Sequence, residues 1–158
     1  MTSTLTAATL SVTLTESINL NGYDQGSKNI TTIASIAEVS KRIVTVTTTE
    51  AVVATFSAAI AAGNYIAANI RYIRLTNLDD TNFITLTFRN QDNDEVAIKL
   101  DAGQSFMWCG DNVNGMTAVF NATEDADAAY STNFGSLTNV QARADSASVD
   151  LEIYIAGK

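Results

Sequence analysis

The residues of this sequence that could do chemistry are mainly carboxylates, and they lie in polar segments rich in Asn and Gly. Loop carboxylates beside Asn side chains and backbone carbonyls are typical calcium ligands, and two acids at a set separation are enough for glycoside hydrolysis. The clusters are Asp79 and Asp80; Asp92, Asp94 and Glu95; Asp111; and Glu124, Asp125 and Asp127. None matches the spacing of an EF-hand loop, and turn formation alone explains Asp at such places. We therefore predict no metal site and no catalytic or cofactor-binding residue, and expect no cofactor.

Residue types and motifs that the sequence lacks exclude several kinds of catalytic and metal-binding site. The chain has no His, which excludes Ser-His-Asp and Cys-His catalysis as well as His-ligated metals. Cys109 is the single cysteine, so no disulfide can form within the chain, and we interpret it as a small, buried or half-buried residue. The sequence also contains no GxGxxG, Walker A, HExxH or CxxC motif. The sequence thus predicts a protein that is not an enzyme.

Three aromatic residues, Tyr72, Phe83 and Tyr154, are predicted on strand faces opposite the main apolar rows. Such rings could stack on a sugar, which is typical of a carbohydrate-binding module. The alternative, which we favour, is that a sandwich has two faces and that a neighbouring subunit buries the outer one.

The net charge and the length of the apolar runs limit which partners the chain can bind. The formal net charge is −8, and only 16% of the residues are charged, so clustered positive charge for phosphate contacts is missing. No apolar run approaches the roughly 20 residues that a membrane-spanning helix needs, and the N-terminal segment lacks the features of a signal peptide. We expect neither nucleic acid nor membrane as a partner.

The clearest structural element is a β-hairpin over Ile84–Leu100. Apolar and polar residues alternate on both sides of the turn NQDND, as in a half-buried antiparallel pair. With the turn centred on Asp92, Arg89 faces Glu95 on one face and three apolar pairs share the other: Phe88 with Val96, Leu86 with Ile98, and Ile84 with Leu100. The turn DAGQ then leads to a third strand, Ser105–Cys109, where Phe106 and Trp108 share a face.

Further strands are predicted at Leu10–Leu20, with a break at Glu16, and at Ile43–Thr49, Ile70–Leu78 and Val149–Ile155. Two segments leave alternatives open. Ile30–Val39 fits either a strand or a short helical turn; for Glu50–Ala62 we favour a strand to about Ser57 and then a helical turn. Asn21–Asn29 is predicted as a loop, and Gly110–Asn139 as a long acidic loop with one weak strand at Met116–Asn121.

About eight strands with little helix predict an all-β fold, an antiparallel β-sandwich like a jelly roll. Residues 1–158 are expected to form a single domain, in which residues 1–20 could be an extended N-terminal arm that pairs with a neighbour's sheet edge.

From Val52 onward, the run VVATFSAAIAAGNYIAANIRYIRLTNLDDTNFITLTFRNQDNDEVAIKLDAGQSFMW and the final SASVDLEIYIAGK resemble small virion structural proteins of marine tailed bacteriophages. In that family an RYIRLTNLD-type strand leads to a hairpin and an AGQSF-type turn, and an alternating strand ends the chain.

The resemblance implies a non-enzymatic capsid decoration or cement protein, or a fibre-type protein, located in the virion and made in the host bacterial cytoplasm. It implies two partners: other copies of the chain, for which a trimer is favoured, and the major capsid protein or another virion protein. The alternative function is a carbohydrate-binding or receptor-binding module of a phage fibre or tail tip.

Overall fold

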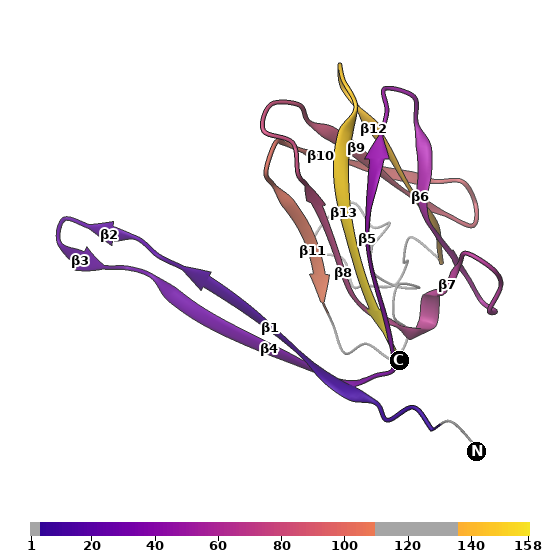
Figure 1. The fold of residues 1–158 in the computed structure, drawn as a ribbon, viewed down its shortest axis with the longest axis horizontal. Helices are drawn as coiled ribbons and strands as arrows, with labels where there is room; N and C mark the ends of the chain where they lie inside the picture. The colour runs from indigo at the N-terminus through magenta and orange to yellow at the C-terminus, as the bar shows by residue number, and fades with distance from the viewer. Residues whose placement is uncertain (1–3, 110–135) are drawn as a thin grey trace, which may run out of the picture.

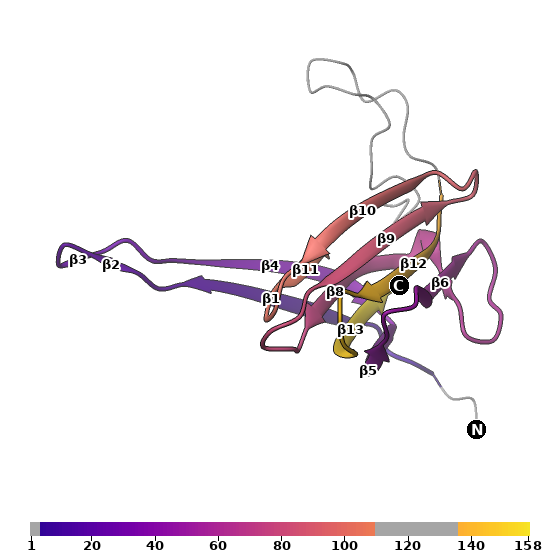
Figure 2. The same cartoon turned by 90° about the horizontal axis from the view of Figure 1, so that it is seen from above.

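In the computed structural model, which describes residues 4–109 and 136–158, two β-sheets pack face to face and a long hairpin projects from them (Figure 1). Seen from above, the hairpin extends well beyond the edge of both sheets (Figure 2). The strands are antiparallel apart from one short parallel pair, and the described residues contain no α-helix. The predicted all-β sandwich is confirmed.

The projecting element is made of four strands, which we call the arm: β1 (Ala8–Glu16), β2 (Asn19–Leu20), β3 (Tyr23–Asp24) and β4 (Ser27–Ile36). One sheet of the sandwich has the order β10 (Glu95–Leu100), β9 (Ile84–Asn90), β12 (Leu137–Ala144), β6 (Ala51–Ser57) and β7 (Tyr65–Ile66). The other has the order β11 (Ser105–Cys109), β8 (Ile70–Asn77), β13 (Val149–Gly157) and β5 (Glu38–Val46). A 3-10 turn at Ala67–Asn69 precedes β8.

The strand pairs of the sandwich are nested. With the two-residue β7 left aside, β5 pairs with β13, β6 with β12, β8 with β11, and β9 with β10. The first strand therefore pairs with the last, the second with the next to last, and so on inward to the β9–β10 hairpin. The β8–β13 and β9–β12 pairs complete the two sheets.

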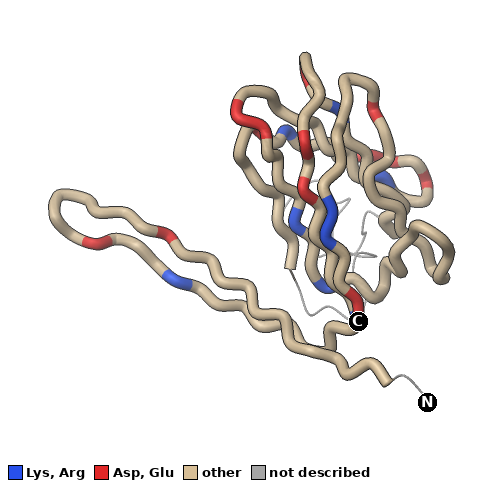
Figure 3. The backbone as a smooth tube through the Cα atoms, in the orientation of Figure 1, with Lys and Arg blue, Asp and Glu red and all other residues tan. Residues whose placement is uncertain are grey.

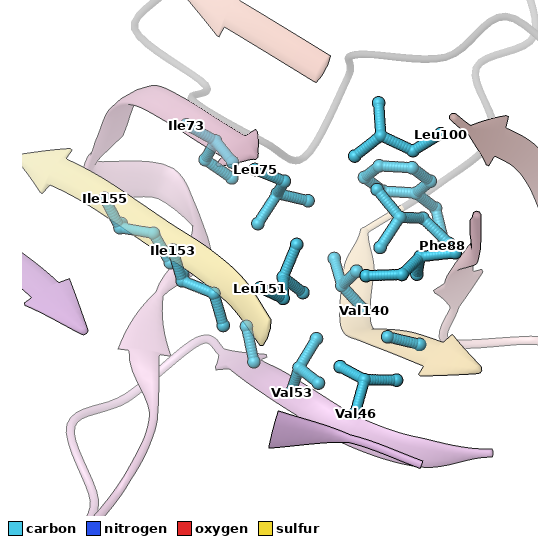
Figure 4. Close-up of a cluster of buried hydrophobic side chains, with 14 of the residues drawn as sticks. Val46, Val53, Ile73, Leu75, Phe88, Leu100, Val140, Leu151, Ile153 and Ile155 are labelled. Atoms are coloured by element: carbon cyan, nitrogen blue, oxygen red, sulfur yellow. The ribbon is translucent and has the colours of Figure 1, made fainter. Parts of the chain in front are cut away.

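The β9–β10 hairpin has the predicted register. Arg89 pairs with Glu95, and Phe88, Leu86 and Ile84 pair with Val96, Ile98 and Leu100 respectively. Side chains from both sheets meet between the layers, with Phe88 and Val140 on one side and Ile73 and Ile153 on the other (Figure 4). Phe106 and Trp108 of β11 pack against this core, as their shared face predicted.

One open alternative is decided in favour of strands, and two predictions about local structure were wrong. Ile30–Val39 forms no helical turn but the end of β4 and the start of β5; Ser35 has a φ of 62°, which resets the alternation and leaves Ile33 and Ile36 three residues apart yet both buried. The strand predicted to about Ser57 is confirmed as β6, but Ala58 and Ala59 after it form bends and Ala62–Gly63 a turn, so the predicted helical turn is wrong. The predicted loop Asn21–Asn29 contains β3 and the first residues of β4, and only its Asn21–Gly22 pair, both with positive φ, forms the tight turn typical of Asn-Gly in hairpins.

Strand β12 was not predicted. It begins inside the segment interpreted as a loop, and register shifts at both of its sheet contacts interrupt its alternation. The weak strand predicted at Met116–Asn121 lies outside the described residues.

Candidate interaction surface: the projecting arm

The base of the arm is held on the outer face of the β11-β8-β13-β5 sheet by a small apolar cluster, which we call the anchor. Ile33 and Ile36 of β4 are 1% and 5% exposed and pack with Tyr72 of β8 and Ala156 of β13. Leu10, Val12, Cys109 and Tyr154 pack around them. The anchor is separate from the main core, so the arm has its own attachment to the sandwich.

The arm joins the sandwich through its backbone as well. The Ala37 amide donates a hydrogen bond to the Gly157 carbonyl at 2.9 Å, and one residue later β5 begins to pair with β13. Because the chain passes directly from β4 into β5, the direction of the arm is fixed by the sheet to which it is connected.

Beyond the anchor, the arm exposes large apolar side chains. Leu14, Ile18, Leu20 and Tyr23 are 49%, 54%, 58% and 74% exposed; we call these four the distal arm residues. Leu14 lies on the same face of β1 as Leu10 and Val12, which belong to the anchor, because the β1–β4 register is regular between Leu10 and Glu16. The apolar row that attaches the arm therefore continues past the sandwich into solvent.

The arm carries little charge. Between Ala8 and Ile36 the only ionisable acids and bases are Glu16, Asp24 and Lys28, all in the outer half of the hairpin (Figure 3). The Ser27 hydroxyl donates to the Glu16 carboxylate across the β1–β4 pair. The arm is thus suited to contact a surface without bringing strong charges to it.

A cleft of about 250 Å³ separates β1 from the sheet; Leu10–Thr13, Tyr72, Arg74 and Tyr154 line it. Arg74 donates to the Glu152 carboxylate and to the Thr76 hydroxyl, and the Lys41 ammonium lies 3.1 Å from the same carboxylate. The hydrogen bonds from Arg74 and then from Lys41 hold the pKa of Glu152 below its usual value, against the opposing effect of burial. The charged groups of Arg74, Lys41 and Glu152 are therefore paired with one another beside the cleft.

Tyr72 and Tyr154 face each other in this cleft. Their rings meet edge to face, with centroids 5.6 Å apart, and Tyr72 is 5% exposed. Burial raises the pKa of the Tyr72 phenol, while Arg74 acts in the opposite direction. The Tyr72 ring is covered by the arm, so it does not form the open platform that sugar stacking requires, and intramolecular packing accounts for it.

Two other residues singled out in the sequence also have packing roles. Cys109 is half-buried beside the anchor, in agreement with its interpretation as a packing residue. Phe83 is half-buried with the Lys99 ammonium 4.5 Å from its ring centroid, which is a cation–π contact.

The carboxylate clusters in the described part of the chain close turns or pair across strands. Asp79 accepts hydrogen bonds from the Thr81 and Asn82 amides at 2.7 and 2.6 Å, and these bonds lower its pKa. Asp80, Asp92 and Asp94 accept from neighbouring side chains in the same turns, and Glu95 pairs with Arg89. No group of three potential metal ligands occurs among residues 4–109 and 136–158. Asp111, Glu124, Asp125 and Asp127 lie outside the described residues.

The sequence prediction included only half of the arm. Residues 1–20 were considered as a single extended strand, whereas β1 pairs with β4 of the same chain, and the anchor residues Ile33 and Ile36 belong to β4. The available signal was the Asn21–Gly22 dipeptide between two β-branched segments, which is the sequence pattern of a hairpin.

No protein-family model, curated protein or solved structure matches this chain. In the part of the chain that the structure describes, no helix is long and apolar enough to cross a membrane.

Proposed function

We propose that this chain is a non-enzymatic virion structural protein, a capsid decoration or cement protein that binds the capsid surface and associates with other copies of itself. The observation that carries the proposal is the arm, whose base is anchored on the sandwich and whose distal residues expose apolar side chains. The arm is a docking element, and the sandwich is the scaffold that presents it.

The physical argument is that a two-stranded hairpin is marginally stable in water and gains stability when its apolar face is covered. The anchor covers the base of the arm, while Leu20 and Tyr23 at its tip remain more than half exposed. Several large apolar side chains exposed on one projecting element indicate a protein–protein contact.

The fold supports the same proposal. Nested pairing of eight strands is the arrangement that a wrapped hairpin produces in a jelly roll, a fold common in viral capsid domains. We propose this finer assignment for the sandwich. The sequence resemblance to small virion proteins of marine tailed bacteriophages begins at Val52 and includes β8 to β11 and β13.

The test is to purify particles from the source that encodes this chain by density gradient and to quantify its peptides against those of the major shell protein. We expect the chain to migrate with intact particles at a fixed and high ratio to the shell protein. A chain found only in fractions without particles would contradict the proposal. A few copies per particle would instead indicate a tail or fibre location and contradict the decoration role.

A further inference from the structure

We infer that the distal arm residues of one copy dock on the outer face of the β11-β8-β13-β5 sheet of a second copy, beside Val39 and Ile43 of β5. The inference rests on the proposed function, because it names the partner of the arm. Each copy gives its arm to another copy and receives an arm either from that same copy or from a third one.

On the arm, the proposed contact continues one that the structure already contains. Leu10 and Val12 pack in the anchor, and Leu14 follows them on the same face of β1 but is 49% exposed. The surface that Leu10 and Val12 meet within the chain is the outer face of this sheet, near Tyr72 and Tyr154. The same row of the arm is therefore suited to a second surface of the same kind.

On the sandwich, the proposed receiving site adjoins the same anchor. Val39 pairs across strands with Ala156, an anchor residue, and Ile43 pairs with Glu152. Directly paired residues share a face of the sheet, so Val39 and Ile43 extend the face that the arm base covers. They are 56% and 57% exposed. The chain thus exposes apolar side chains on both sides of one existing contact, on the arm and on the sheet.

The exposed part of the arm and the whole strand β5 are also of similar length. The arm from Leu14 to Gly22 is about 26 Å long, and β5, with nine residues, is about 30 Å long, at roughly 3.3 Å per residue. Among the described residues, β5 has a neighbouring strand on one side only, so an approaching arm meets no further strand of the sandwich there.

The size of the contact indicates a closed assembly. The four distal arm residues offer on the order of 400 Å² of apolar surface, about half of the roughly 800 Å² per partner that a stable interface buries. A copy that both gives and receives an arm makes two such contacts and reaches that size. In a reciprocal dimer both contacts lie in one interface of about that size, whereas in a closed ring each copy makes one contact with each of its two neighbours.

The first experiment measures the mass of the purified full-length chain by light scattering over a range of concentrations. We expect the wild-type chain to form an oligomer. In the double variant Leu20→Ser/Tyr23→Ser and in Ile43→Lys, the concentration at which the oligomer dissociates should be at least tenfold higher. The matched controls are Ile30→Ser, which is 53% exposed on the arm face opposite Leu14, and Val52→Lys, which is 55% exposed on β6 of the other sheet. Both controls are expected to leave the mass unchanged.

The second experiment traps the contact in a Cys109→Ser background. Copies with Leu20→Cys are mixed with copies carrying Ile43→Cys under mild oxidation, and we expect a disulfide-linked pair containing one of each. Mixing Leu20→Cys copies with Val52→Cys copies is expected to give no more linked pair than random collision does. Equal trapping with Val52→Cys, or a purified chain that stays monomeric, would overturn the inference. So would an oligomer that either the arm variant or Ile43→Lys leaves intact.

These results separate the inference from the proposed function. A chain that is monomeric in solution yet present on particles in many copies would refute docking on a second copy and self-association, and would leave the capsid-binding part of the proposed function standing. A chain that associates through its arm but is absent from particles would do the reverse.

Discussion

The separation of the anchor from the main core predicts that the arm can be released without unfolding the sandwich, and Ile33→Ala tests this. Ile33 is 1% exposed and lies at the centre of the anchor, opposite Leu10 in the β1–β4 register. Replacing a buried Ile by Ala costs about 2–5 kcal/mol, and a site at the edge of the molecule that can partly collapse belongs at the lower end, about 2–3 kcal/mol.

This cost falls on the attachment of the arm, because Ile33 makes no contribution to the core between the two sheets. At about 1.4 kcal/mol for each factor of ten, the detached population of the arm should rise roughly 30- to 150-fold. Since an isolated hairpin is marginally stable, detachment exposes the β1 and β4 amides to exchange.

Native-state hydrogen exchange is the assay. Amides of β1 and β4 are expected to exchange roughly 30- to 150-fold faster in Ile33→Ala, while those of β9 and β12 keep their wild-type protection. Ile30→Ala is the matched control, since it removes the same side chain from the same strand on the half-exposed opposite face. Equal acceleration in the arm and in β9 would refute the reasoning, because arm and sandwich would then open together. Unchanged exchange in the arm would refute it as well, because the anchor would not be what holds it.

Three further predictions concern single residues. Glu152→Gln should be less stable than the wild type, because Arg74 and Lys41 stabilise the ionised carboxylate and lower its pKa. The contribution of this carboxylate to folding stability is present above the ordinary pKa of Glu, about 4.3, and is lost as the pH falls through the lowered pKa. Urea midpoints of the two proteins should differ from about pH 6 to about pH 8 and converge as the pH falls below the ordinary pKa of Glu, and a difference that grows on acidification would contradict the assignment. Gly26→Ala should loosen the outer end of the arm, because an added Cβ would lie 2.5 Å from the Glu16 carbonyl oxygen; exchange should accelerate near Glu16 and Ser27 but not in Gln25→Ala. Leu86→Ala should lower the free energy of unfolding by about 2–5 kcal/mol, because Leu86 is fully buried between the sheets, whereas Thr85→Ala on the other face should cost far less.

The sequence was sufficient for the fold where each strand keeps strict alternation. In the β9–β10 hairpin every second residue is large and apolar, so only one register buries them all, and that register is the observed one. In β12 the buried residues are Leu137, Val140, Ala142 and Ala144, among others. A register shift places the buried residues Leu137 and Val140 three positions apart instead of two. The buried alanines that follow are small and only weakly hydrophobic, so the segment lacks the clear alternation that predicts a strand.

The arm was only partly predictable for a related reason. Strand β4 of the arm carries Ile33 and Ile36 at a spacing that fits a helical turn, and only the positive φ of Ser35 makes both face the sheet. Such a backbone conformation is rare for residues other than Gly, so sequence patterns do not anticipate it. The attachment of the arm could therefore not be predicted without the conformation of Ser35. The proposed receiving surface could not be predicted without the sheet order, which places β5 at an edge.

A hairpin arm has a physical advantage over the single extended strand considered from the sequence. A lone strand of Leu10–Leu20 would be ordered only on docking, and fixing each residue of its backbone costs about 1–2 kcal/mol. In the hairpin, β1 is already paired with β4 and its base is already packed on the sandwich, so much of this ordering precedes docking. A preordered element can then bind through a small apolar surface, since less of the contact energy is lost to ordering. The distal arm residues offer such a small surface, and because the anchor orders the arm in advance, this surface can be sufficient for binding.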